Sequence, residues 1–115
     1  MKLNINPSPN YSTKIRKKEE IQFIVIHYTG MQSERACIER LTSSKSQVSA
    51  HYLINRKGDT IKMVDEKYTA WHAGKSKWKK FIDLNDKSIG IELVNKGHQF
   101  GYEKFSKKQI SNLIL

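Results

Sequence analysis

The segment Ile21–Gly30 constrains the fold of this chain more than any other stretch. Its apolar and β-branched residues predict a strand that is buried on both faces and ends in a polar tip. His27 lies at that tip. A histidine at the end of a rigid strand is held firmly enough to ligate a metal or to act as an acid or base. The simpler alternative is that His27 only hydrogen-bonds the edge of the sheet.

Length and charge limit the classes of protein to be considered. The 115 residues suffice for one domain with a single core. The net charge of +10 is mostly lysine, since only four of the 21 basic residues are arginine. Planar phosphate recognition favours arginine, so this diffuse lysine coat indicates a solvated surface or attraction to an anionic polymer such as cell wall. A nucleic-acid binder that stacks bases on Tyr68, Trp71 and Trp78 is the least favoured alternative.

The N-terminal residues 1–20 combine prolines, asparagines and charges without periodicity. They predict an extended arm that packs loosely on a domain formed by residues 21–115. The chain has no apolar signal-peptide core and no apolar run of membrane-spanning length, so we expect no membrane insertion. A cytoplasmic location is the default expectation, and a periplasmic or cell-wall site stays open. Cys37 is the single cysteine, which excludes an internal disulfide and a Cys-x-x-Cys metal knuckle.

The remaining elements follow from local signals. Ser33 predicts the N-cap of a short helix over residues 34–42. Further strands are predicted at 48–55, 60–64 and 88–94, and Gly58 favours a hairpin turn between the first two. Residues 68–82 read as an irregular, aromatic-rich segment that either walls a ligand site or packs against the sheet. Ser106 and Gln109 form a capping box for a last helix, which reaches Leu115 without a C-cap signal, so we expect an incomplete domain.

Glu92 stands out because it interrupts an apolar strand. A carboxylate buried alone costs several kcal/mol, so it must be paired, face a metal or be protonated. The alternative is that Glu92 points outward at an edge and is solvated.

Four segments together resemble successive motifs of the zinc-dependent N-acetylmuramoyl-L-alanine amidases, in the order of that family and over residues 21 to 95. They are Ile24–Thr29, Val48–Ile54, Ala70–Gly74 and Asn85–Leu93. The resemblance implies an α/β fold with a mixed central sheet flanked by helices, incomplete at the C-terminus. It also implies hydrolysis of the amide between N-acetylmuramic acid and L-alanine, with peptidoglycan or a muropeptide as substrate.

The resemblance assigns roles to individual residues. His27 matches the first ligand of a catalytic Zn²⁺, and Glu92 matches the carboxylate that takes a proton from water and passes it to the leaving amine. Ala70, Trp71 and His72 match a segment that lines the substrate. His51 matches a motif histidine with a structural role.

Two further zinc ligands of the family are expected after the helix that begins near Ser106, and the printed sequence stops before them. His98 precedes that helix on an expected surface loop and is not a replacement. One imidazole holds zinc weakly, so we expect weak or no zinc binding and doubtful activity in this chain alone. The alternative function is a muropeptide-binding domain that does not cut.

Overall fold

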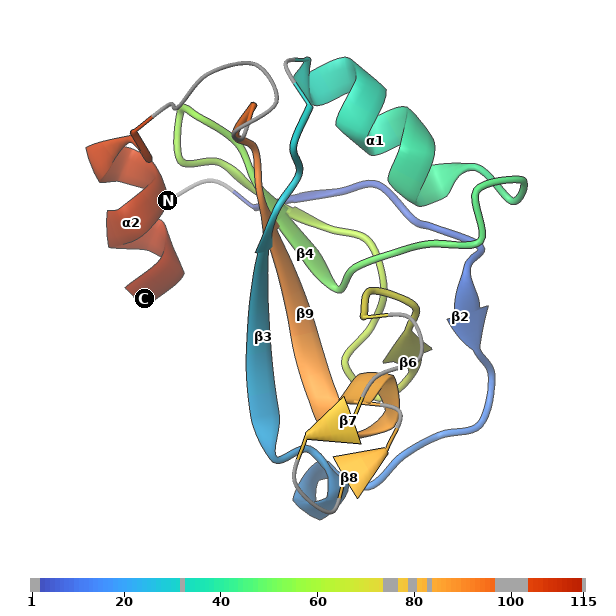
Figure 1. Ribbon diagram of the computed structural model, residues 1–115. Coiled ribbons are helices and arrows are strands. Elements are labelled where there is room, and N and C mark those ends of the chain that lie inside the picture. Colours follow the sequence, from blue (N-terminus) through green and yellow to red (C-terminus); the bar gives the residue numbers. More distant parts are fainter. Residues whose placement is uncertain are drawn as a thin grey trace.

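The computed structural model describes residues 3–31, 33–73, 77–78, 81–82, 84–96 and 104–114. Its centre is a mixed five-stranded sheet in the order β1–β5–β4–β9–β3 (Figure 1). β4 and β5 pair antiparallel, and the other neighbouring strands pair in parallel. The strands are β1 (Leu3–Ile5), β3 (Phe23–Tyr28), β4 (Tyr52–Ile54), β5 (Thr60–Lys62) and β9 (Ser88–Leu93). The predicted α/β class with a mixed central sheet is confirmed.

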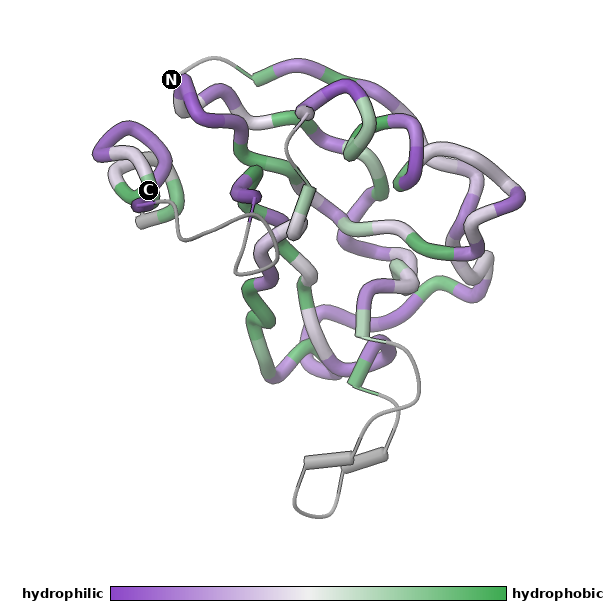
Figure 2. Tube along the Cα trace, turned by 45° about the horizontal axis from the view of Figure 1, so that its top comes forward, coloured by the Kyte–Doolittle hydropathy of each residue, from purple (hydrophilic) through white to green (hydrophobic). Residues whose placement is uncertain are grey.

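Strand β3 forms one edge of this sheet and is exposed on one of its faces, so the prediction that it is buried on both faces is wrong. Ile24, Ile26 and Tyr28 are 65%, 51% and 49% exposed, whereas the alternate residues, including His27, are partly buried. Figure 2 shows the hydrophobic run along β3 at the margin of the molecule. An apolar run predicts a strand, but it does not tell how many strands or layers cover it.

The hairpin of β4 and β5 confirms the predicted antiparallel pair. Gly58 in its turn has φ +88°, a conformation that glycine adopts without steric cost. Both strands are shorter than predicted, and residues 48–51 lead into β4 as irregular chain.

Helix α1 (Glu34–Thr42) has the predicted bounds, and it covers the sheet face that carries the main core. The Ser33 side chain accepts a hydrogen bond from the Ala36 N–H and caps the helix. Cys37 and Leu41 pack into a buried cluster with residues of the sheet and its loops, namely Leu53, Ile61, Met63 and Val94.

The N-terminal arm is an integral part of the fold, which corrects the prediction of loose packing. Strand β1 extends the main sheet, and β2 (Tyr11–Ser12) pairs with β6 (Thr69–Ala70). Between them, Asn10 is buried and its amide donates to the carbonyls of Ser43 and Val48. The pairing partners lie far along the chain, so no local pattern could have predicted them.

Arg16 fixes the second half of the arm. This guanidinium is buried and donates to the backbone carbonyls of Glu66, Asn85 and Asp86. A short 3₁₀ helix, η1 (Lys18–Glu20), then leads into β3.

Helix α2 (Lys107–Ile114) begins with the predicted capping box, in which Ser106 and Gln109 exchange side-chain and backbone hydrogen bonds. Gln109 is almost fully buried, and its amide also donates to the carbonyls of Ile54 and Val94. Figure 1 shows α1 and α2 on either side of the strands, so the prediction of flanking helices is confirmed.

The segment 68–82, predicted as irregular, contains short strands in its described part. β6 pairs with β2, and β7 (Lys77–Trp78) pairs with β8 (Phe81–Ile82). A second 3₁₀ helix, η2 (Leu84–Lys87), precedes β9. Within the described residues, no helix has the length and apolarity needed to cross a membrane.

Candidate active site

His27 and Glu92 lie side by side in the register of the parallel strands β3 and β9. Partners in adjacent strands project from the same face of a sheet, so both side chains reach the face that α1 covers. Both border one pocket of about 220 Å³. The other residues around it are Tyr28, Thr29, Met31, Cys37, Arg40, Leu41, Val48, Ser49 and His72.

Glu92 is half-buried, and within the described part of the chain its carboxylate has no counterion in hydrogen-bond contact. Its Oε2 atom is buried and has no hydrogen-bond partner among the described residues. Burial raises the pKa of Glu92 to about 7, and the Arg40 charge, which lowers this pKa, only partly opposes the effect. The carboxyl group can therefore take up and return a proton near neutral pH. The alternative of a solvated, outward-pointing Glu92 does not hold.

His27 contacts a second imidazole. Its Nε2 atom lies 3.1 Å from Nδ1 of His72, and the two rings meet edge to face with centroids 5.3 Å apart. Burial lowers the pKa of His27, so the ring is neutral near pH 7. A neutral imidazole keeps one nitrogen lone pair, which is what a metal ligand requires.

Both the ring and the backbone of His72 are held by hydrogen-bonding distances to neighbouring residues. Its Nε2 atom lies 3.0 Å from the hydroxyl of Ser88, and its backbone N–H donates to the side-chain oxygen of Asn85. Burial, helped by the charges of His27, His51 and Arg16, lowers the pKa of His72 to about 3. This imidazole therefore stays neutral throughout the physiological range.

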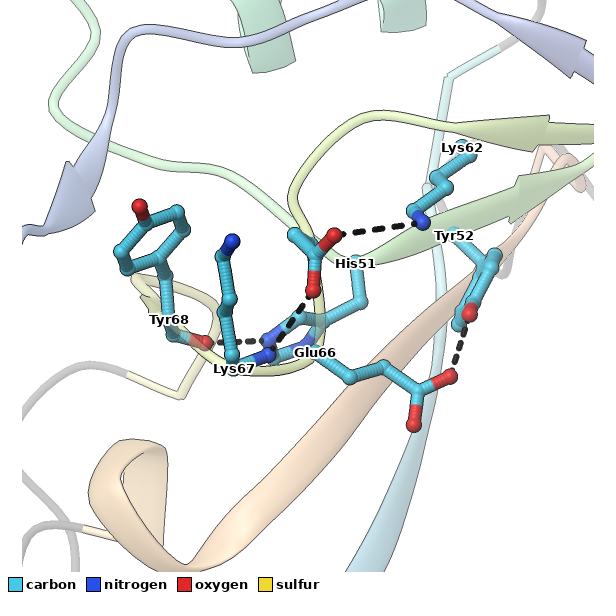
Figure 3. Close-up of polar contacts among 7 residues, drawn as sticks. His51, Tyr52, Lys62, Glu66, Lys67 and Tyr68 are labelled. Atoms are coloured by element: carbon cyan, nitrogen blue, oxygen red, sulfur yellow. Dashed lines mark hydrogen bonds and ion pairs between the residues drawn. The ribbon is translucent and has the colours of Figure 1, made fainter. Parts of the chain in front are cut away.

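His51 is fully buried and its polar atoms are engaged in the fold. The Gly90 N–H donates to Nδ1 of His51, so Nε2 carries the ring proton and donates to the Tyr68 carbonyl (Figure 3). Burial is the main cause that lowers the pKa of His51. The ring ties β9 to the β6 segment and leaves no lone pair for a metal, as a structural role requires.

Only one of the three residues predicted to line the substrate borders the pocket. His72 borders the pocket. Ala70 is fully buried in β6, and Trp71 donates its indole N–H to Ser12 on the N-terminal arm. Neither of these two borders the pocket of His27 and Glu92.

Several residues that line the pocket carry no signal in the sequence, and Arg40 matters most among them. It supplies the pocket's basic side chain other than histidine and lies on the same face of α1 as Cys37 and Leu41. The helix was predicted from the sequence, but only the packing of α1 shows that Arg40 borders the pocket. Cys37 forms part of the floor, where burial raises the pKa of its thiol.

Among the described residues, no group of three or more His, Cys, Asp and Glu side chains could hold a metal ion. His98 lies outside the described residues. The pocket still offers the donor types that suit Zn²⁺, because it contains a neutral imidazole at His27 and an unpartnered carboxylate oxygen at Glu92.

Comparisons with known proteins point to one family. The family model described as N-acetylmuramoyl-L-alanine amidase (Amidase_2) matches residues 17–115. AmiD of Escherichia coli K12, named an N-acetylmuramoyl-L-alanine amidase, is 39% identical over 106 residues. That match covers 82% of this chain and 37% of AmiD. AmpD of Haemophilus influenzae, named a 1,6-anhydro-N-acetylmuramyl-L-alanine amidase, is 29% identical, with 94% of this chain and 68% of AmpD covered.

Solved structures agree with these relatives. A crystal structure of an AmpD derivative superposes with a TM-score of 0.78 at 25% identity and covers 97% of this chain and 69% of that one. A complex of E. coli AmiD with the substrate anhydro-N-acetylmuramic acid-L-Ala-D-γ-Glu-L-Lys has a TM-score of 0.75 at 34% identity. That superposition covers 90% of this chain and 49% of AmiD. The chain thus spans about a third to two thirds of the length of these relatives.

Proposed function

Because the chain belongs to the N-acetylmuramoyl-L-alanine amidase family (Amidase_2), we propose that it hydrolyses the amide that joins N-acetylmuramic acid to L-alanine. The substrate class is peptidoglycan or a muropeptide released from it. The observation that carries the proposal is the placement of His27 and Glu92 as register partners around one pocket. A metal ligand and a proton carrier must converge on the same carbonyl for this chemistry.

Glu92 is the proposed catalytic residue. It takes a proton from the attacking water as the water oxygen bonds to the carbonyl carbon. It then passes the proton to the alanine nitrogen as the C–N bond breaks. The products are the lactyl carboxylate and a peptide with a free amino terminus. Its pKa of about 7 suits both halves of this exchange.

His27 is the proposed metal ligand that this chain contributes. A zinc ion, when bound, supplies Lewis-acid polarisation of the amide carbonyl. A neutral imidazole and an open pocket support the assignment. His27 alone gives low affinity, because catalytic zinc is usually held by three protein ligands.

Substrate lining is proposed for His72, which borders the pocket, and for its sequence neighbours Ala70 and Trp71. The compound in the AmiD complex, anhydro-N-acetylmuramic acid-L-Ala-D-γ-Glu-L-Lys, is the natural probe for this chain. A γ-linked glutamate leaves its α-carboxylate free, and the Arg40 guanidinium at the pocket rim is a suitable partner for such a group.

The test is an incubation of this muropeptide with zinc and the protein, followed by mass spectrometry. The test uses the 115-residue chain and, in parallel, the same chain joined to the C-terminal segment of AmiD. We expect the joined protein to release the free L-Ala-D-γ-Glu-L-Lys peptide. Saturable binding of the muropeptide without any cleavage in either protein would favour the binding-domain alternative.

A further inference from the structure

A chain of hydrogen bonds runs from the backbone of η2 to His27. The Ser88 hydroxyl oxygen lies 2.6 Å from the Leu84 carbonyl oxygen. A carbonyl oxygen only accepts, so Ser88 donates its single proton there. Nε2 of His72 lies 3.0 Å from the same hydroxyl oxygen, which can now only accept. The network therefore assigns the ring proton of His72 to Nε2.

The chain of hydrogen bonds continues from His72 to the ring of His27. His72 has no carboxylate among its described hydrogen-bond partners to stabilise a second ring proton, so with Nε2 protonated its Nδ1 is a bare acceptor. Nε2 of His27 lies 3.1 Å from that acceptor and must donate to it. The His27 ring likewise has no carboxylate among its described hydrogen-bond partners to stabilise a second proton, so its Nδ1 keeps the free lone pair. Nδ1 of His27 has no hydrogen bond to any described residue, and His27 borders the pocket.

We propose that Ser88 and His72 are positioning residues that fix His27 in its Nε2–H tautomer and leave the Nδ1 lone pair open to a metal ion in the pocket. Metal-binding histidines generally donate their other ring N–H to a fixed acceptor, which orients the ring and raises its basicity. Here the acceptor is a second imidazole, itself fixed by a serine. The metal part of this inference rests on the proposed function, whereas the tautomer does not.

The packing around His72 shows that the arrangement is built into the fold. A Cβ atom added to Gly90 would lie 2.3 Å from Cγ of His72, so only glycine lets the ring lie against β9. Ser88 is fully buried, and Asn85 accepts hydrogen bonds from the backbone N–H groups of His72 and Ala73. The ring has little freedom to turn and water does not reach Ser88.

The test is long-range ¹H–¹⁵N NMR of the zinc-free, ¹⁵N-labelled chain at neutral pH, which reports the tautomer of each histidine. We expect Nε2–H for both His27 and His72. Ser88→Ala removes the acceptor of His72 with almost no change in volume. We expect this variant to shift a substantial fraction of both rings to Nδ1–H. A zinc titration followed on the His27 ring signals should then show about 10- to 100-fold weaker binding.

Ser8→Ala is the matched control, since Ser8 is a buried serine whose hydroxyl also donates to a backbone carbonyl, that of Leu41. It should leave both tautomers and zinc affinity unchanged. Gly90→Ala keeps every hydrogen-bonding group but displaces the His72 ring, and it should have the same effect on His27 as Ser88→Ala. An Nδ1–H tautomer of His27 in the unaltered chain would overturn the proposal without bearing on amide cleavage. So would unchanged tautomers in a folded Ser88→Ala chain.

Discussion

His27 and Glu92 are register partners on the parallel strands β3 and β9, so the two groups that the proposed reaction needs leave the sheet side by side on one face. The sheet itself sets their spacing, because adjacent strands lie about 4.8 Å apart. A loop could not hold the pair so rigidly. Two of the three histidines in the family motifs, His27 and His51, have different surroundings: His27 borders the pocket, whereas His51 is fully buried.

That difference predicts opposite effects of two alanine substitutions. His27→Ala should abolish the weak zinc binding at the pocket and change the free energy of unfolding by less than about 1 kcal/mol, because one imidazole–imidazole hydrogen bond is lost. His51→Ala leaves the Gly90 N–H and the Tyr68 carbonyl unsatisfied and should lower stability by about 3 kcal/mol. Zinc titration and denaturant unfolding of both variants check this. Equal losses of stability would show that His27 is structural too.

The raised pKa of Glu92 predicts how stability depends on pH. The folded state binds the Glu92 proton more tightly than the unfolded state, whose pKa is near 4.5. Stability from this group is therefore full below pH 4.5 and is lost as the pH rises through about 7. Glu92→Gln cannot ionise, so relative to the unaltered chain it should gain at most about 3 kcal/mol between pH 4.5 and 8.

Zinc-free denaturant unfolding at several pH values measures this difference. Comparing the two proteins cancels His72, whose lowered pKa makes stability rise between about pH 3 and 6.5 in both. A constant difference between the unaltered and Glu92→Gln chains across this pH range would show that Glu92 is not buried in its neutral form.

Gln109 predicts how firmly α2 is attached. Its amide donates to two buried carbonyls at the ends of β4 and β9, and its side-chain oxygen caps the helix. Gln109→Ala should therefore lower stability by about 2 to 4 kcal/mol and speed hydrogen exchange in α2. Lys108→Ala, at an exposed neighbouring position, is the control and should have little effect. Unchanged exchange in α2 after Gln109→Ala would mean that other contacts hold the helix.

The open face of β3 predicts self-association of the 115-residue chain. Ile24 and Ile26 are more than half exposed on an edge strand, and such strands favour edge-to-edge contacts. Replacing both with threonine keeps β propensity and removes apolar surface. The double variant should bind less hydrophobic dye and elute as a monomer by size-exclusion chromatography. A monodisperse, dye-free unaltered chain would contradict this expectation.

Local sequence signals predicted local structure well. Ser33 and the Ser106–Gln109 box predicted the starts of both helices, because a cap is read by the backbone within three or four residues. Gly58 predicted the hairpin, because the turn conformation depends on the few residues that form it. The edge position of β3 and the strands of the N-terminal arm depend on partners far along the chain, and no local pattern encodes them.

In the candidate site, too, local sequence signals predicted some residues, and tertiary packing determines the others. Glu92 was conspicuous because a carboxylate in an apolar strand is costly, and His27 because it ends a strand. The contact between His72 and Gly90 and the reach of Arg40 to the pocket come from tertiary packing. For Trp71, the motif predicted a residue that lines the substrate, but its indole N–H donates to Ser12 on the N-terminal arm.

The central claim is that Glu92 carries the proton in amide cleavage, and one comparison tests it most directly. The chain joined to the C-terminal segment of AmiD is loaded with zinc, with Glu92 intact or replaced by glutamine, and both forms are assayed on anhydro-N-acetylmuramic acid-L-Ala-D-γ-Glu-L-Lys. We predict that Glu92→Gln slows peptide release about 10²- to 10⁴-fold while zinc content stays the same. Release at the unaltered rate from the zinc-loaded Glu92→Gln protein would contradict the account.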